Sequence, residues 1–233
     1  GNSIATDSSF FNSNYLHPGS LSSLLLPFSS VKMTYANTEG TMLNTYAGLF
    51  VLAVLPLCAW LSIKEKNRTA WLMLAASLLF LVISFGDATP ARNAINLLPG
   101  FSYFRNPAIF RFYFILSLIL FTAIVLQNRK FADIITEKLS RYMLWLMVVA
   151  SLLVLLLNSK SLKDFPGASL TDLVKKISFS HALFISSFIQ VLVAMLLLIL
   201  IRAKKWRVAK LVFAADLVIN TILCTPFFSV SSY

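Results

Sequence analysis

The residues best suited to chemistry lie in one stretch, residues 86–111, where arginines alternate with prolines. It carries Arg92, Arg105 and Arg111, and its three prolines favour turns over continuous helix. Arginine stays charged and offers paired N–H donors that match phosphate oxygens. Pro107 suits the first turn of a helix, an end that attracts anions. The stretch predicts a site for a lipid phosphate or pyrophosphate. The simpler alternative is that these arginines reach ordinary headgroups.

A second candidate is a polar pair, Asp216 and Asn220, inside an apolar stretch near the C-terminal end. The two residues are one helical turn apart. A carboxyl group within a bilayer is costly and is therefore a candidate for function. The alternative is a carboxyl group that holds helices together by hydrogen bonding inside the bundle. No apolar run contains a second acidic residue, so the pair has no visible partner for a proton relay.

Familiar catalytic patterns are missing from the sequence. It contains no nucleophile elbow, zinc-protease helix or phosphate-binding glycine loop. Two cysteines and two histidines give no zinc-binding spacing. We therefore expect neither a metal nor a cofactor, and the sequence assigns no catalytic residue.

The composition identifies the kind of molecule that must position these residues. Of 233 residues, 58% are hydrophobic and 12% are charged, and the mean hydropathy is +0.79. Soluble domains are about 45–50% apolar and about 25% charged. The values exclude a soluble globular, disordered or coiled-coil protein. They predict an all-α, polytopic membrane bundle.

Six apolar runs approach the length of about 20 residues that a membrane-spanning helix needs. The second and fourth are short. Residues 1–42 would form a segment outside the membrane, with an interfacial or re-entrant stretch at Leu21–Phe28. Residues 43–227 would form the bundle and 228–233 a tail. The runs are Leu43–Ile63, Thr69–Phe85, Ala108–Gln127, Tyr142–Leu157, Ser180–Ile201 and Val208–Phe227.

The net charge of +11 comes mostly from loops. Twelve of the 20 Lys and Arg residues lie in the short connections after the first, third and fifth runs or, for Lys210, at the start of the next run. This density predicts that these loops are cytoplasmic and that both ends lie outside. It also predicts contact with anionic lipids rather than with nucleic acid, because no basic domain is present.

Several short motifs, taken in order, resemble the bacterial YfhO-like membrane proteins. The most specific stretch is Leu98-Pro99-Gly100-Phe101, continuing through Phe104-Arg105-Asn106-Pro107 to Arg111-Phe112. Leu16-His17-Pro18, Leu24-Leu25-Leu26-Pro27 and Tyr46-Ala47-Gly48 precede it, and Ala215-Asp216-Leu217 with Asn220 follows. The resemblance covers most of residues 16–227.

The resemblance implies a glycosyltransferase of the GT-C type in a bacterial inner membrane. Such an enzyme takes a sugar from a polyprenyl-phosphate donor and passes it to an acceptor in the cell envelope on the outer face. Family members are longer, and their catalytic acidic residue lies in an earlier outer loop. We therefore expect this chain to be a fragment that lacks the general base. Arg105, and to a lesser extent Arg111, match the motif arginines.

Two other functional classes remain open at this stage. A non-enzymatic membrane subunit or scaffold of an envelope complex, with membrane-protein partners, would fit the absence of a catalytic set. A transporter or lipid flippase would require an inverted repeat and broken helices near mid-membrane. Pro56 and Asp216 are the only sequence features that favour a transporter or flippase.

Overall fold

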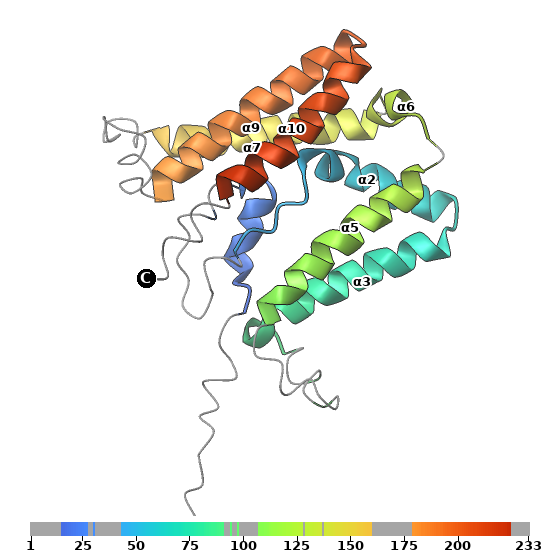
Figure 1. The fold of residues 1–233 in the computed structure, drawn as a ribbon, viewed down its shortest axis with the longest axis vertical. Coiled ribbons are helices and arrows are strands. Elements are labelled where there is room, and N and C mark those ends of the chain that lie inside the picture. The colour runs from blue at the N-terminus through green and yellow to red at the C-terminus, as the bar shows by residue number, and fades with distance from the viewer. Residues whose placement is uncertain are drawn as a thin grey trace, which may run out of the picture.

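A computed structural model describes residues 15–27, 30, 43–90, 94, 97, 107–127, 129–136, 138–159 and 179–224. In these ranges every regular element is a helix (Figure 1). The α-helices are α2 (Leu49–Lys64), α3 (Arg68–Ser84), α5 (Phe110–Leu126), α6 (Phe131–Thr136), α7 (Lys138–Leu157), α9 (Phe179–Arg202) and α10 (Trp206–Cys224). Short 3-10 helices are η1 (Pro18–Leu24), η4 (Gly86–Ala88) and η6 (Pro107–Ile109).

Three helical stretches are long and apolar enough to cross a membrane. They are Pro107–Leu126, Lys138–Leu157 and Ser180–Arg202. Helices α2 and α3 are also apolar but shorter. The part of the chain that the structure describes is thus all-helical and holds three helices that could cross a membrane, as the composition predicts.

Each of the six expected runs coincides with a helix, with shifted ends. Helix α5 follows directly from Pro107, so the expected proline in the first turn is confirmed. Helix α7 begins at Lys138, four residues before the expected start. The largest difference is at α2, which begins at Leu49 rather than Leu43. Gly48, with φ 95° and ψ 142°, interrupts any helix before that point.

Helix α2 is the centre of the bundle. It packs against α5, α7 and α10, and α3 is held mainly through α5. Figure 1 shows α2 between the α3–α5 pair and the group formed by α7, α9 and α10. Nine of its residues are buried, on all sides of the helix, which suits a helix that is apolar all round. Its core contacts include Phe121, Leu144 and Leu197 of the neighbouring helices.

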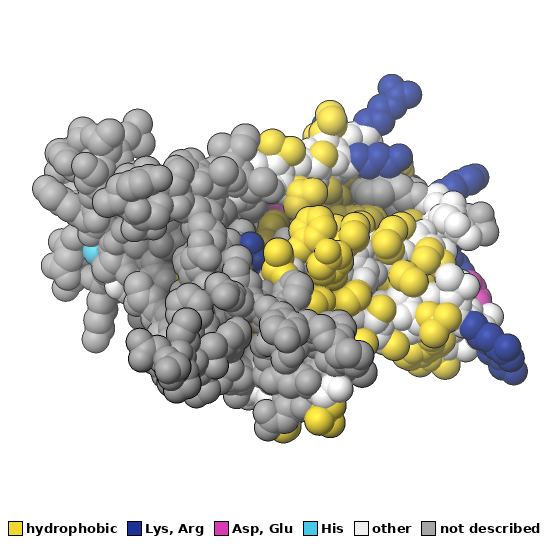
Figure 2. All heavy atoms as spheres, turned by 60° about the horizontal axis from the view of Figure 1, so that its bottom comes forward, with side chains coloured by type: hydrophobic (Ala, Val, Ile, Leu, Met, Phe, Trp, Pro, Cys, Tyr) yellow, Lys and Arg dark blue, Asp and Glu magenta, His cyan; other side chains and the backbone are white. Residues whose placement is uncertain are grey.

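The outward faces of the other helices are apolar. Large hydrophobic side chains exposed there include Leu79 on α3, Leu120 on α5, Leu153 on α7 and Ile199 on α9. Figure 2 shows such a hydrophobic surface, with Lys and Arg side chains gathered at one end of the molecule. In water a patch of this size would be a liability, whereas in a bilayer it faces lipid chains.

The cationic end of the molecule is where α2 joins α3, α5 leads to α6, and α9 turns into α10. We call it the basic end. Its connections carry Lys64, Lys66, Arg68, Arg129, Lys130, Arg202, Lys204 and Lys205. All four tryptophans lie within two helical turns of this end, as an aromatic belt would. The helix ends on the other side form the opposite end.

The segment before α2 packs against the opposite end of the bundle. The Leu16 amide donates to the Ser84 carbonyl over 2.8 Å, and Leu16 and Leu26 are buried. Ser23 Oγ lies 2.8 Å from Thr45 Oγ1, in a buried contact. The expected interfacial stretch is thus, over residues 21–27, part of the folded bundle.

Gly86 lies where this segment meets the starts of η4 and η6. Its φ is 49°, and a Cβ atom there would lie 2.7 Å from Tyr15 Cβ and 2.9 Å from Pro107 Cγ. We expect Gly86→Ala to lower the free energy of unfolding by about 1–2 kcal/mol, through strain and a forced shift of Tyr15. Thermal unfolding of the purified chain in detergent measures this. Gly19→Ala, at an exposed position without a positive φ, is the control. Equal melting temperatures for the two variants would contradict the prediction.

Candidate functional site

The buried carboxyl group of Asp216 is the centre of a polar cluster inside the bundle. Asp216 is only 3% exposed. Its Oδ2 accepts a hydrogen bond from the Tyr46 hydroxyl and another, of 3.1 Å, from the Leu49 amide. Asn220 Nδ2 donates to Asp216 Oδ1 over 3.0 Å and to the Asp216 carbonyl over 2.9 Å. Both carboxyl oxygens therefore have donors from the protein.

The position of Asp216 explains much of this arrangement. Leu49 is the first residue of α2, and no side chain of its own segment caps that helix. The first amides of a helix lack intrahelical partners and carry a partial positive charge. Asp216 supplies the missing acceptor from α10, far along the chain. The helix-packing interpretation of Asp216 is therefore supported by a specific contact: it fixes the start of α2.

Gln190 adds a polar side chain with an unfilled donor. It is 1% exposed on α9. Its Nε2 has no hydrogen-bond partner in the part of the chain that the structure describes. Asp216 is ten residues beyond the start of α10, and Gln190 is twelve before the end of α9. At 1.5 Å per residue, both lie roughly 15–18 Å from the basic end.

Arg111 is held close to this cluster. Its Nη1 donates to the Asn44 carbonyl over 2.9 Å, and Asn44 Oδ1 accepts from the Tyr46 amide over 2.9 Å. Arg111 thereby anchors the strand-like approach to α2 that carries Tyr46 and Gly48. Of the other arginines predicted to bind phosphate, Arg92 and Arg105 lie outside the described residues.

Five stretches of the sequence are therefore connected by contacts on the side of the bundle away from the basic end. Residues 15–26 contact the end of α3 and Thr45. Residues 44–48 contact Arg111 on α5 and Asp216 on α10. The structure thus brings Arg111 and the pair of Asp216 and Asn220 to the same segment, residues 44–49.

No family model, curated protein or solved structure matches this chain. Function is therefore inferred from the motifs and from the contacts between them. Among the described residues, no group of three or more His, Cys, Asp or Glu side chains is placed to hold a metal ion.

Tyr46 is the site residue that sequence reasoning missed. Its tripeptide Tyr46-Ala47-Gly48 was part of the motif set, but nothing in the sequence pairs it with a residue 170 positions away. Gln190 was noticeable as an amide inside an apolar run, which favours hydrogen bonding between helices. His181 is buried at the start of α9.

Proposed function

We propose that this chain is the membrane portion of a GT-C-type glycosyltransferase that uses a polyprenyl-phosphate-linked sugar to modify an acceptor in the cell envelope. The motifs shared with YfhO-like proteins support the class. The composition and the three apolar helices support an integral membrane setting. The acid–base residue would lie in a segment outside these 233 residues.

The observation that carries the proposal is the convergence of the motif stretches. Tyr46-Ala47-Gly48, Arg111 and the Asp216–Asn220 pair are separated by up to 170 residues in the sequence, yet hydrogen bonds connect them. Residues that only anchored separate helices to lipid headgroups would not need contacts with one another. A shared site at this end is the arrangement that a donor-binding region would need.

Each part of this region then has a distinct task. The arginines of residues 86–111 would bind the donor phosphate and stabilise the charge that develops as the sugar leaves. Asp216 would hold the scaffold and not act as the general base. Its two oxygens already accept hydrogen bonds from Tyr46, Leu49 and Asn220, so a base that must take a proton from an acceptor hydroxyl is needed elsewhere.

We also propose that all six helices of the bundle, α2, α3, α5, α7, α9 and α10, cross the membrane, with the basic end in the cytoplasm. Helix α2 spans about 24 Å at 1.5 Å per residue, less than the hydrocarbon thickness of about 30 Å. Residues 43–48 add an extended segment, and the Leu43 and Asn44 carbonyls and the Thr45 and Tyr46 amides in it are bonded to side chains of the protein. Such bonding is what non-helical backbone at membrane depth requires. The donor-binding end would then face the outer surface, where polyprenyl-phosphate sugars are used.

The decisive experiment is Arg105→Ala in the full-length protein. We expect transfer of labelled sugar from a polyprenyl-phosphate donor to fall by about 10²–10³-fold, the usual cost of losing one charge-stabilising donor. Membrane insertion and yield should not change. Arg105 is preferred to Arg111, because Arg111 also holds the Asn44 carbonyl and its loss would combine folding with chemistry.

Arg207→Ala, an exposed arginine at the basic end, is the matched control and should transfer as the wild type does. Transfer unchanged in Arg105→Ala would exclude the arginine clamp. The subunit or scaffold interpretation would replace the enzyme if the protein purified with a stoichiometric membrane partner and bound no donor lipid.

A further inference from the structure

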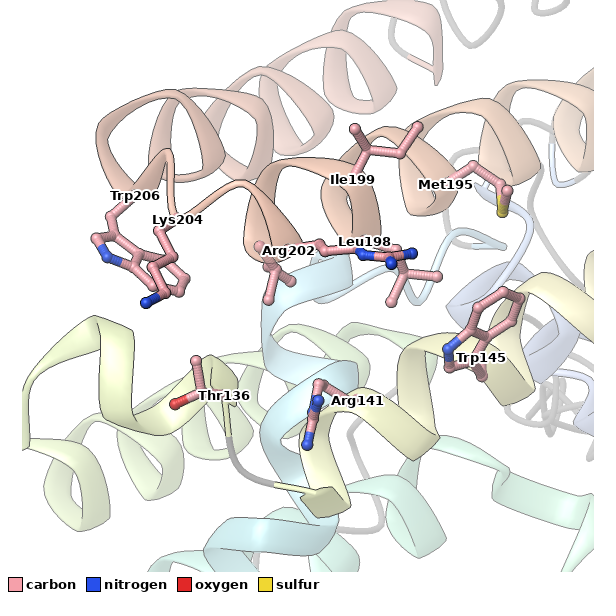
Figure 3. Close-up of a pocket in the computed structure, with 10 residues that line it drawn as sticks. Thr136, Arg141, Trp145, Met195, Leu198, Ile199, Arg202, Lys204 and Trp206 are labelled. Atoms are coloured by element: carbon pink, nitrogen blue, oxygen red, sulfur yellow. The ribbon is translucent and has the colours of Figure 1, made fainter.

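A cavity of about 590 Å³ lies at the basic end, on the side of the bundle away from α3 and α5. Its walls come from α6, α7, α9, the turn after α9 and the first residue of α10. Figure 3 shows α9 and its turn on one side, with Arg202 and Lys204, and α7 on the other, with Arg141 and Trp145. It is remote from Asp216 and does not depend on the proposed transferase activity.

The charges around this cavity have one sign. Its cationic lining residues are Arg141, Arg202 and Lys204, and none of its lining residues is acidic. No ion pair involves them in the described ranges, where the recorded ion pair joins Arg129 and Glu65. Lys204 has a positive φ of 55°, which turns the chain between α9 and α10. Three cations from separate positions therefore lie around one cavity, with no counter-charge among the lining residues that the structure describes.

The rest of the lining is apolar and extends away from the charges. Trp145 follows Arg141 by one helical turn, and Leu198 precedes Arg202 by one turn. Met195 lies seven residues before Arg202, roughly 10 Å deeper along α9. Trp145 and Ile199 are more than half exposed, so this wall is open sideways to the lipid chains.

A neighbouring pocket differs from this cavity in the charges that line it. It also lies at the basic end and contains Arg129 and Lys130, but Glu65 and Asp133 line it as well. Arg129 is paired with Glu65 at 2.5 Å. Acidic residues of the protein balance its cations, so this pocket does not need a bound anion for charge balance.

We propose that the cavity bounded by Arg141, Arg202 and Lys204 binds one anionic phospholipid. The phosphate contacts the three cations, and an acyl chain lies along Trp145, Ile199 and Met195. A bidentate guanidinium suits a phosphate oxygen pair. A volume of 590 Å³ is in the range of small-molecule sites and accommodates a headgroup with the first part of a chain. An inorganic phosphate would leave the apolar wall uncovered.

The test uses quenching of tryptophan fluorescence by brominated lipids in nanodiscs that contain the 233-residue chain. Trp60→Phe and Trp71→Phe leave Trp145 and Trp206, both of which line the cavity. Brominated phosphatidylglycerol should quench them at a much lower mole fraction than brominated phosphatidylcholine does. Equal quenching by the two lipids would overturn the proposal.

The charge variants show whether the preference depends on this cavity. In that background, Arg141→Gln with Arg202→Gln should weaken the apparent affinity for phosphatidylglycerol about thirtyfold, and Arg141→Gln alone about fivefold. The single variant covers the case in which the double variant fails to fold. Arg129→Gln with Lys130→Gln removes the same charge from the same end and should change the affinity less than twofold. Equal losses in the two double variants would mean a general surface-charge effect and would refute the site.

Inorganic phosphate distinguishes the two sources of the anion. We expect that phosphate in excess leaves quenching by phosphatidylglycerol unchanged. Full displacement of the lipid by inorganic phosphate would mean that the cavity recognises a soluble phosphate, and the lipid proposal would be wrong.

Discussion

Asp216→Ala is expected to lower the free energy of unfolding by about 3–5 kcal/mol. The change removes the acceptor of the Tyr46 hydroxyl and of the Leu49 amide in a buried place, and one of the two acceptors of the Asn220 side-chain amide. Each buried polar group without a partner costs about 1–3 kcal/mol, and the sum is reduced by relaxation. Thermal unfolding of the purified chain in detergent should show a fall of roughly 6–20 °C.

Two further variants separate the carboxyl group from a general effect of losing an acidic residue. Asp216→Asn keeps an acceptor for Tyr46 and Leu49 but turns an amide group toward Asn220, so a loss of about 1–2 kcal/mol is expected. Asp133→Ala, at an exposed position on α6, should change stability by less than about 0.5 kcal/mol. If Asp216→Ala were no worse than Asp133→Ala, Asp216 would not stabilise the start of α2.

Gly48→Ala is the second large effect, with an expected loss of about 2–3 kcal/mol. Gly48 has φ 95° and ψ 142°, close to a region that side chains other than glycine avoid at a cost of about 1–3 kcal/mol. An added Cβ would also lie 3.4 Å from Leu217 Cδ1 on α10. To escape the strain, the backbone must rotate, and rotation moves the Leu49 amide away from Asp216. Gly19→Ala again provides the control.

Combining the two variants tests whether they act on one contact. Because Gly48→Ala acts partly by breaking the bond from Leu49 to Asp216, the loss in the double variant should be smaller than the sum of the single losses by about 1 kcal/mol. Simple additivity would show that Gly48 and Asp216 stabilise the bundle independently.

The helices could be predicted from the sequence because apolar runs and proline positions are local signals. The start of α5 at Pro107 follows from the Asn106-Pro107 step, and the ends of α9 lie within one residue of expectation. The start of α2 was placed six residues early, since hydropathy alone does not reveal that Gly48 has a conformation incompatible with a helix. Residues 43–48 are apolar enough to resemble part of a helix, but they form an extended segment that leads into α2.

The candidate site was predictable only in its isolated parts. A lone carboxyl group in an apolar run is costly to place inside a bilayer, so Asp216 and the nearby Asn220 could be predicted as a candidate site. Tyr46 could not, because its partner is in the last helix and no local pattern connects them. Arg111 was predicted to bind an anion, and the described contact is with a backbone carbonyl instead. Phosphate binding by Arg111 stays a prediction.

The link between Tyr46 and Asp216 has a consequence for biosynthesis. The two residues are 170 positions apart, so at about 5–20 residues per second Tyr46 leaves the ribosome roughly 10–30 s before its partner. During that interval the start of α2 is present without its acceptor, although α2 is the helix around which the others pack. Nascent chains arrested before α10 would retain this defect, which marks them for recognition by membrane quality control.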